Sequence, residues 1–146
     1  MENLLKLQAI LTVHADNFRI LHWKACGKNF DSAHKIAGDY YDMVSDDVDN
    51  IAEILLRYDV NPLNIFNCIK VAVKSGTNVS IPPQNDYTKE EVIKYSGLIL
   101  TEILNVIAEA LEEAQNPVSV GVKAYLESLY DKYDKESRYL NKRRSK

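Results

Sequence analysis

The sequence of 146 residues is poor in the residues that build turn-rich or cross-linked folds. It has five glycines and four prolines, too few for the many tight turns of an all-β protein. Its two cysteines, Cys26 and Cys68, lie far apart and form no Cys-x-x-Cys pair, so they indicate neither a disulfide framework nor a zinc knuckle. The chain is nevertheless long enough to bury a hydrophobic core without such cross-links.

Long apolar runs and a strong excess of charge are also missing. No run of about 18 apolar residues is present, so the sequence predicts no membrane-spanning helix. The first residues, Met1 to Lys6, lack the basic start and small-residue cleavage site of a secretory signal, which favours a cytoplasmic location. With 18 basic and 21 acidic residues the net charge is −3, so the surface as a whole is not expected to coat nucleic acid.

Helical periodicity of apolar residues is the main pattern that the sequence does contain. Gly27 is the expected end of the first helix, since glycine adopts the left-handed conformation that ends many helices, and Asn61-Pro62 closes the second. Thr88 and Glu91 have the spacing of a capping box, which marks the start of another long helix. Asn116-Pro117 ends that helix. The expected helices cover residues 3–24, 31–58, 63–73, 88–115 and 118–141, and a basic tail at 142–146 is expected to fray.

Two long helices, a long crossover and two more long helices predict one all-α domain over residues 1–146. A short connection makes the first two helices antiparallel neighbours, and a crossover of about 25 residues can carry the chain along the whole bundle. The sequence therefore predicts a ferritin-like four-helix bundle, with a short extra helix in the long crossover between helices 2 and 3.

An acidic stripe on the second helix is the most informative feature. Five carboxylates recur at spacings of three and four residues, within an arc of about 80° on the helix, opposite its apolar side. The stripe is therefore expected to face away from the core. A solvated acidic face is the simpler explanation, but like charges at this spacing destabilise a helix unless cations compensate them. The five residues are Asp39, Asp42, Asp46, Asp49 and Glu53, and Lys35 lies in the middle of their arc.

The three histidines indicate where such a cation would bind. His22 ends the first helix and His34 opens the second, so both lie at one end of a shared surface. His14 lies within the apolar arc of the first helix and is interpreted as a core or interface histidine. Ferrous iron binds imidazole nitrogen together with carboxylate oxygen, and Asp49 and Glu53, one helical turn apart, present two such oxygens in one direction. The sequence leaves open whether these four groups converge.

A Glu-x-x-His pair, which di-iron ferritin-like proteins place on each of two helices facing inward, is absent. The residues three positions before the histidines are Leu11, Arg19 and Asp31. A di-iron centre within the bundle is therefore not expected. Any bound metal is predicted to lie outside the bundle, most simply between subunits.

At these residues the sequence resembles the Dps family, the mini-ferritins. The His22-Trp23 pair followed by Gly-x-Asn-Phe over residues 27–30 is similar to the family's first-helix signature, and His34 falls where the second family histidine stands. Residues 47–53 are similar to its carboxylate ligand segment. The match is specific over roughly residues 14–62 and only generic in the last half of the chain.

The resemblance implies a dodecameric shell of identical subunits with ferroxidase sites at two-fold dimer interfaces. There His22 and His34 of one subunit would face Asp49 and Glu53 of its partner. Iron is the expected metal: His22, Asp49 and Glu53 are expected to bind Fe²⁺, and His34 is expected to contact a second iron or its bridging water. The resemblance also implies hydrogen peroxide as the preferred oxidant and storage of ferric iron inside the shell, as a protection against oxidative damage.

The sequence departs from the family pattern beside the second histidine. The family often carries an aspartate four residues after it, where this chain has Gly38. Asp39 and Asp42 are candidates for a supporting role at that point. Trp23, beside the site, is expected to pack, with the quenching of an oxidising equivalent as the alternative.

Two other functions stay open as alternatives. A ferritin-like shell or interaction protein would keep the fold with weak or no ferroxidase activity. DNA binding through the basic tail is the other, but it is not favoured because the net charge is negative. The candidate DNA contacts are Lys142, Arg143, Arg144 and Lys146.

Overall fold

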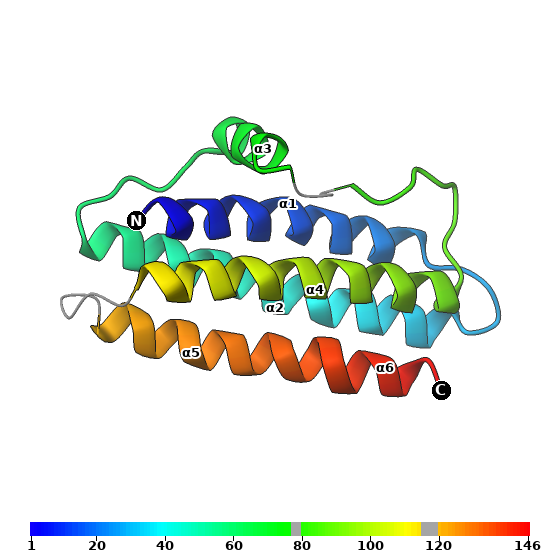
Figure 1. Ribbon diagram of the computed structural model, residues 1–146. Coiled ribbons are helices and arrows are strands. Elements are labelled where there is room, and N and C mark those ends of the chain that lie inside the picture. The colour runs from blue at the N-terminus through cyan, green and yellow to red at the C-terminus, as the bar shows by residue number, and fades with distance from the viewer. Residues whose placement is uncertain (77–79, 115–119) are drawn as a thin grey trace.

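Four long helices pack side by side in the computed structural model, which describes residues 1–76, 80–114 and 120–146 (Figure 1). They are α1 (Glu2–Lys24), α2 (Phe30–Arg57), α4 (Lys89–Glu113) and α5 (Val120–Lys135), and α5 continues through a π-helical turn, η2 (Glu136–Leu140), into α6 (Asn141–Arg144). The short helix α3 (Ile65–Lys74) lies outside the bundle and packs on α1. The predicted all-α, ferritin-like class is confirmed.

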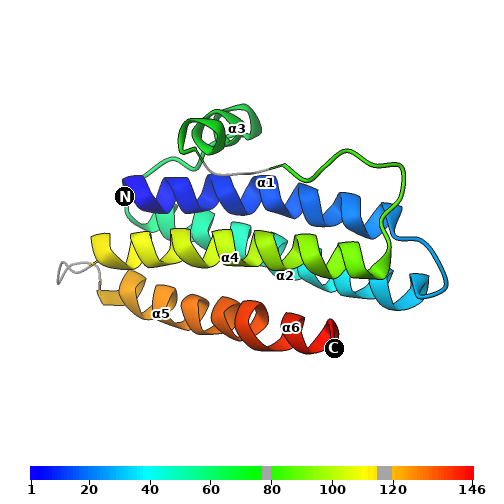
Figure 2. The same cartoon turned by 45° about the vertical axis from the view of Figure 1, so that its right-hand side comes forward.

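The connections follow from the lengths of the segments between the helices. A short loop joins α1 to α2, and Gly27 in that loop has φ +93°, a conformation that glycine adopts without strain. The crossover from α2 to α4 passes through α3 and runs the length of the bundle, so α2 and α4 point the same way (Figures 1 and 2). Its end is fixed by backbone hydrogen bonds of 2.9 Å from Cys26 N–H to the Tyr87 carbonyl and from Tyr87 N–H to the Lys24 carbonyl.

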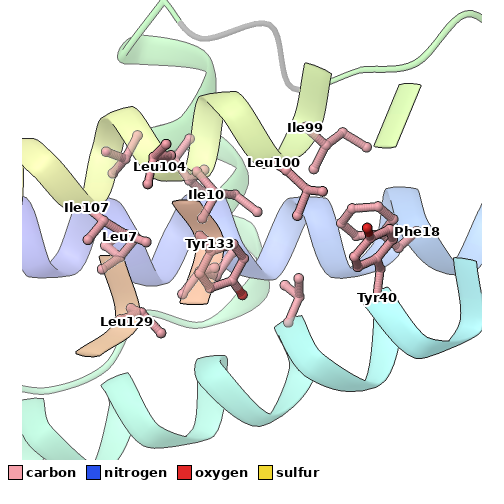
Figure 3. Close-up of a cluster of buried hydrophobic side chains, with 14 of the residues drawn as sticks. Leu7, Ile10, Phe18, Tyr40, Ile99, Leu100, Leu104, Ile107, Leu129 and Tyr133 are labelled. Atoms are coloured by element: carbon pink, nitrogen blue, oxygen red, sulfur yellow. The ribbon is translucent and has the colours of Figure 1, made fainter. Parts of the chain in front are cut away.

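Apolar side chains from all four long helices meet in a continuous core (Figure 3). The rings of Phe18 on α1 and Tyr40 on α2 lie 5.2 Å apart, and Tyr133 of α5 is fully buried. His14 is also fully buried, as its place in the apolar arc predicts. Its Nε2 lies 3.1 Å from a carboxylate oxygen of Glu102 on α4, so the ring is satisfied within the subunit.

Most helix ends agree with the sequence-based prediction, and some features near them differ. Thr88 and Glu91 form the predicted capping box, with bonds of 3.0 and 3.2 Å. The second helix ends at Arg57, within one residue of the predicted end at 58, but a Schellman turn at Asp59, with φ 58°, ends it and not Asn61-Pro62. The tail that was expected to fray is helical through Arg144. The predicted break at Asn116-Pro117 lies outside the described residues.

No helix within the described ranges is long and apolar enough to cross a membrane.

Candidate metal centre

His22 and His34 form a stacked pair where α1 ends and α2 begins. Their ring centroids are 3.7 Å apart and the rings are inclined by 18°. Each ring bonds the backbone of the other residue: His22 Nδ1 lies 2.7 Å from the His34 carbonyl, and His34 Nδ1 lies 2.8 Å from the His22 carbonyl. The ring of Phe30 stacks on His34 at 5.0 Å and closes one side of the pair.

These two hydrogen bonds determine which nitrogen of each ring is available for a metal. A carbonyl oxygen only accepts, so both Nδ1 atoms must carry the proton and donate it. In a neutral imidazole the lone pair is then on Nε2. Neither Nε2 atom has a hydrogen-bond partner among the described residues. The fold thus holds two half-buried imidazoles in the tautomer that binds a divalent metal through Nε2.

Gly38 gives the His22 ring the space that it occupies. A Cβ atom built at position 38 would lie 2.8 Å from His22 Nδ1 and 2.9 Å from its Cε1, closer than real side chains approach. Any residue other than glycine would therefore displace the ring or the helix. This contact supplies a structural reason for Gly38 at the position where the sequence departs from the family pattern.

Asp49 and Glu53 lie on the outer face of α2. All five residues of the acidic stripe are exposed, which confirms that the stripe faces away from the core of the subunit. Asp49 also lines a groove of about 540 Å³ between α1, α2 and α3. It follows His34 by about 15 residues on the same helix, which is about 22 Å at 1.5 Å per residue.

The histidines and the carboxylates therefore do not converge within one chain. In the described residues, no three histidine, cysteine, aspartate or glutamate side chains are close enough together to hold a metal ion. We call the candidate ligands His22 and His34, at the end of the bundle, the nitrogen half-site, and Asp49 and Glu53, in the last third of α2, the oxygen half-site.

The three residues expected near the centre have different surroundings. Trp23 is 63% exposed and does not pack in the core of its own subunit, contrary to the expectation for an indole; the Arg19 guanidinium lies 4.9 Å from its ring centroid. Asp39 forms an ion pair with Lys35 at 2.8 Å. Asp42 is exposed on the stripe.

Asp47 is a buried carboxylate that the sequence analysis did not single out. It accepts a hydrogen bond of 2.7 Å from the Tyr133 hydroxyl and one of 2.8 Å from the Lys132 ammonium. Burial and the neighbouring Asp47 carboxylate raise the pKa of Tyr133 well above its ordinary value, so the phenol stays protonated and donates. The sequence does indicate that Asp47 is buried, because on a helical wheel it falls among the apolar residues of α2, away from the stripe.

An apolar surface borders the groove at Asp49. On α3, Phe66 is 73% exposed, and its neighbours on the same helix are also open to solvent. Cys68 and Ala72 form the buried side of α3 against the bundle. The exposed apolar residues of α3 are Ile65, Phe66, Ile69 and Val73.

The basic residues proposed for DNA lie on and after α6. The Arg144 guanidinium donates a hydrogen bond of 2.5 Å to the Tyr40 hydroxyl, which fixes the last helical turn against α2. Lys142, Arg143 and Lys146 are exposed.

Solved structures share this arrangement over nearly the whole chain. The CAIP protein of Helicobacter cinaedi matches with a TM-score of 0.88 and 19% identity, over 99% of this chain and 98% of that chain. The Dps of Staphylococcus aureus matches with a TM-score of 0.85 and 22% identity, over 99% and 93%. The chain has the fold of the Dps proteins. In sequence, no protein-family model and no curated protein matches it.

A third structure places the Dps fold in a wider group. The Dps of Vibrio cholerae O1 is described as a member of a broad superfamily of ferritin-like diiron-carboxylate proteins, and it matches with a TM-score of 0.84 and 20% identity, over 96% of this chain and 85% of that chain. The Dps resemblance, specific only over residues 14–62 in the sequence, thus extends to the whole fold.

Proposed function

We propose that this protein is a mini-ferritin that oxidises Fe²⁺ with hydrogen peroxide and stores the ferric product inside a shell of identical subunits. The observation that carries the proposal is the His22–His34 pair, whose reciprocal backbone bonds free both Nε2 atoms for metal. Asp49 and Glu53, exposed on α2 and out of reach of the same chain's histidines, are the matching oxygen ligands.

A two-fold dimer is the simplest assembly that would complete this centre. In such a dimer two copies of α2 can run antiparallel, so the nitrogen half-site of each subunit meets the oxygen half-site of the other. The exposed Trp23 and the apolar face of α3 provide surface for burial in this contact. The Dps-like fold supports a dodecamer built from such dimers.

Each candidate ligand has its own role in the proposed reaction. His22 of one subunit and Asp49 and Glu53 of the other hold one Fe²⁺, and His34 contacts the second iron or its bridging water. The two Fe²⁺ ions give up one electron each; these electrons cleave the O–O bond of one hydrogen peroxide molecule, which takes up two protons and leaves as two water molecules. Consuming both reactants together, in the cytoplasm, would limit the one-electron chemistry that releases hydroxyl radicals.

The first test is oxidation of Fe²⁺ in anaerobic buffer, started with stoichiometric hydrogen peroxide. Asp49→Ala should lose the fast phase, whereas Asp46→Ala, which removes an exposed carboxylate one turn away on the same stripe, should keep it. Equal loss in both variants would mean that the stripe acts only through its total charge. Wild-type oxidation no faster than that of iron in buffer would leave a ferritin-like shell or interaction protein without this chemistry.

Mixed oligomers test the intersubunit placement. His22→Ala and Asp49→Ala subunits are each expected to be inactive alone. When they are dissociated and reassembled together, a dimer of one of each restores one complete centre, since its His22 and Asp49 then come from different chains. Activity should return in the mixture. Inactive mixed oligomers of the correct size would contradict a shared centre.

A further inference from the structure

The start of α4 and the segment α6 lie at the same end of the bundle (Figures 1 and 2). A concave basic surface lies between them. It encloses about 560 Å³ between the first turns of α4, the α6 segment and Asn29 at the start of α2. Glu90 is the acidic residue in its lining. The cationic lining residues are Lys89, Lys94, Lys142, Arg144 and Lys146. We call these five the basic pocket.

The side of the basic pocket that is formed by α6 and the residues after it is held in place by buried contacts. Asn141 is 4% exposed, and its amide donates a hydrogen bond of 2.9 Å to the Ile93 carbonyl of α4. Arg144 bonds the Tyr40 hydroxyl and lies over the Tyr40 ring at 5.5 Å. The backbone N–H of Lys146 still donates to the Arg143 carbonyl at 3.2 Å. The cations at the end of the chain therefore belong to an ordered turn that faces α4.

The positive charge of the basic pocket is not neutralised by ion pairs. Within the described part of the chain, none of its five cations lies within 4.0 Å of a carboxylate oxygen. Glu136 acts on Arg144 from a longer distance. Lys89 is the first residue of α4, where the helix dipole disfavours a cation. This clustering occurs in a chain whose net charge is −3.

We propose that the basic pocket binds a small multivalent phosphate anion. Two walls of a cavity present four lysine ammonium groups and one guanidinium, and phosphate oxygens accept several such charge-assisted hydrogen bonds at once. An anion there offsets the repulsion among the five cations and the cost of Lys89 at the helix start. A concave site also concentrates the positive field, which favours a compact anion. A DNA duplex needs a row of contacts along its backbone, which one cavity on a negatively charged subunit does not provide.

The test is calorimetric titration of the intact assembled protein with sodium tripolyphosphate at low salt, and with inorganic phosphate as the weaker probe. Lys89→Ala/Lys94→Ala should lower the affinity for tripolyphosphate by at least about tenfold, because two positive charges that attract the anion are lost. The matched control is Lys70→Ala/Lys74→Ala, which removes the same charge from the exposed side of α3 and should change the affinity by less than about twofold. Circular dichroism and size-exclusion chromatography check that both variants fold and assemble.

Two results would overturn the proposal. Equal weakening by both double variants would mean that tripolyphosphate responds only to net charge. Binding of a short labelled DNA duplex that depends on Lys89 and Lys94, without binding of tripolyphosphate, would assign the basic pocket to a nucleic-acid backbone. Neither measurement uses iron, so failure here is independent of the proposed ferroxidase function.

Discussion

Gly38 shows how the absence of one methyl group determines the geometry of the candidate metal centre. The added Cβ of Gly38→Ala would meet the His22 ring at 2.8 Å, so the ring must move and its bond to the His34 carbonyl is lost. Losing the contacts that orient a metal-binding histidine typically costs about 10- to 100-fold in affinity or activity. We expect a loss of that size in the initial rate of peroxide-driven Fe²⁺ oxidation, and weaker Co²⁺ binding measured by absorption.

Gly121→Ala is the control for this change. Gly121 is also helical, but a Cβ there meets nothing within 4 Å, so the rate and the Co²⁺ affinity should stay at the wild-type values. If Gly38→Ala matches this control, the space beside His22 is not what holds the ring.

The residues of the candidate centre could be predicted from the sequence only in part. His22, His34, Asp49 and Glu53 follow from helical spacing and from the Dps resemblance, because both depend on positions near one another in the chain. The reciprocal bonds between the histidines could not be predicted, since they depend on how closely α1 and α2 approach. Gly38 was visible only as a missing aspartate until the structure placed it against the His22 ring.

At the level of helices, Asp47 ties α5 to α2 through Tyr133 and Lys132. Asp47→Ala leaves the buried Tyr133 hydroxyl without its acceptor, and an unsatisfied buried polar group costs about 1–3 kcal/mol. We expect the free energy of unfolding to fall by about 2 kcal/mol, with a lower melting temperature measured at one fixed protein concentration. Asp46→Ala, an exposed neighbour, should stay within about 0.5 kcal/mol of the wild type.

A double-mutant cycle separates the hydrogen bond from other effects of the substitution. Tyr133→Phe should make the loss caused by Asp47→Ala smaller, because no hydroxyl is then left unsatisfied. If the two losses simply add, Asp47 stabilises the bundle by some route other than Tyr133.

Helix class and order were predictable, whereas some helix ends were not. Apolar periodicity and the Thr88–Glu91 capping box depend on local sequence, and both agree with the structure. The predicted end of the second helix, residue 58, is within one residue of Arg57, but Asn61-Pro62 is not the feature that ends it. The chain leaves the helix earlier at Asp59, and the Val60 N–H bonds the Leu55 carbonyl at 2.9 Å to close that turn. An aspartate in the left-handed region is uncommon, so periodicity alone does not reveal it.

At the scale of the whole molecule, several large apolar side chains of the single chain are exposed and not buried in its core. The exposed face of α3 borders the groove that contains Asp49, and Trp23 is uncovered on α1. The exposed apolar residues grouped on α3 are typical of an interaction site. Because the histidines and carboxylates of one chain cannot meet, assembly through this surface and iron oxidation should be lost together.

Phe66→Glu tests this link. Phe66 is 73% exposed, so a charge there leaves the fold of the subunit intact but opposes burial of α3 against another chain. We expect sedimentation velocity to show a smaller species, and the same sample to oxidise Fe²⁺ with hydrogen peroxide no faster than buffer does. Asn67→Glu, on the same exposed helix, adds the same charge without replacing an apolar side chain and should assemble and react like the wild type. A Phe66→Glu protein that dissociates to monomers yet keeps the fast reaction would place the complete iron site within one chain.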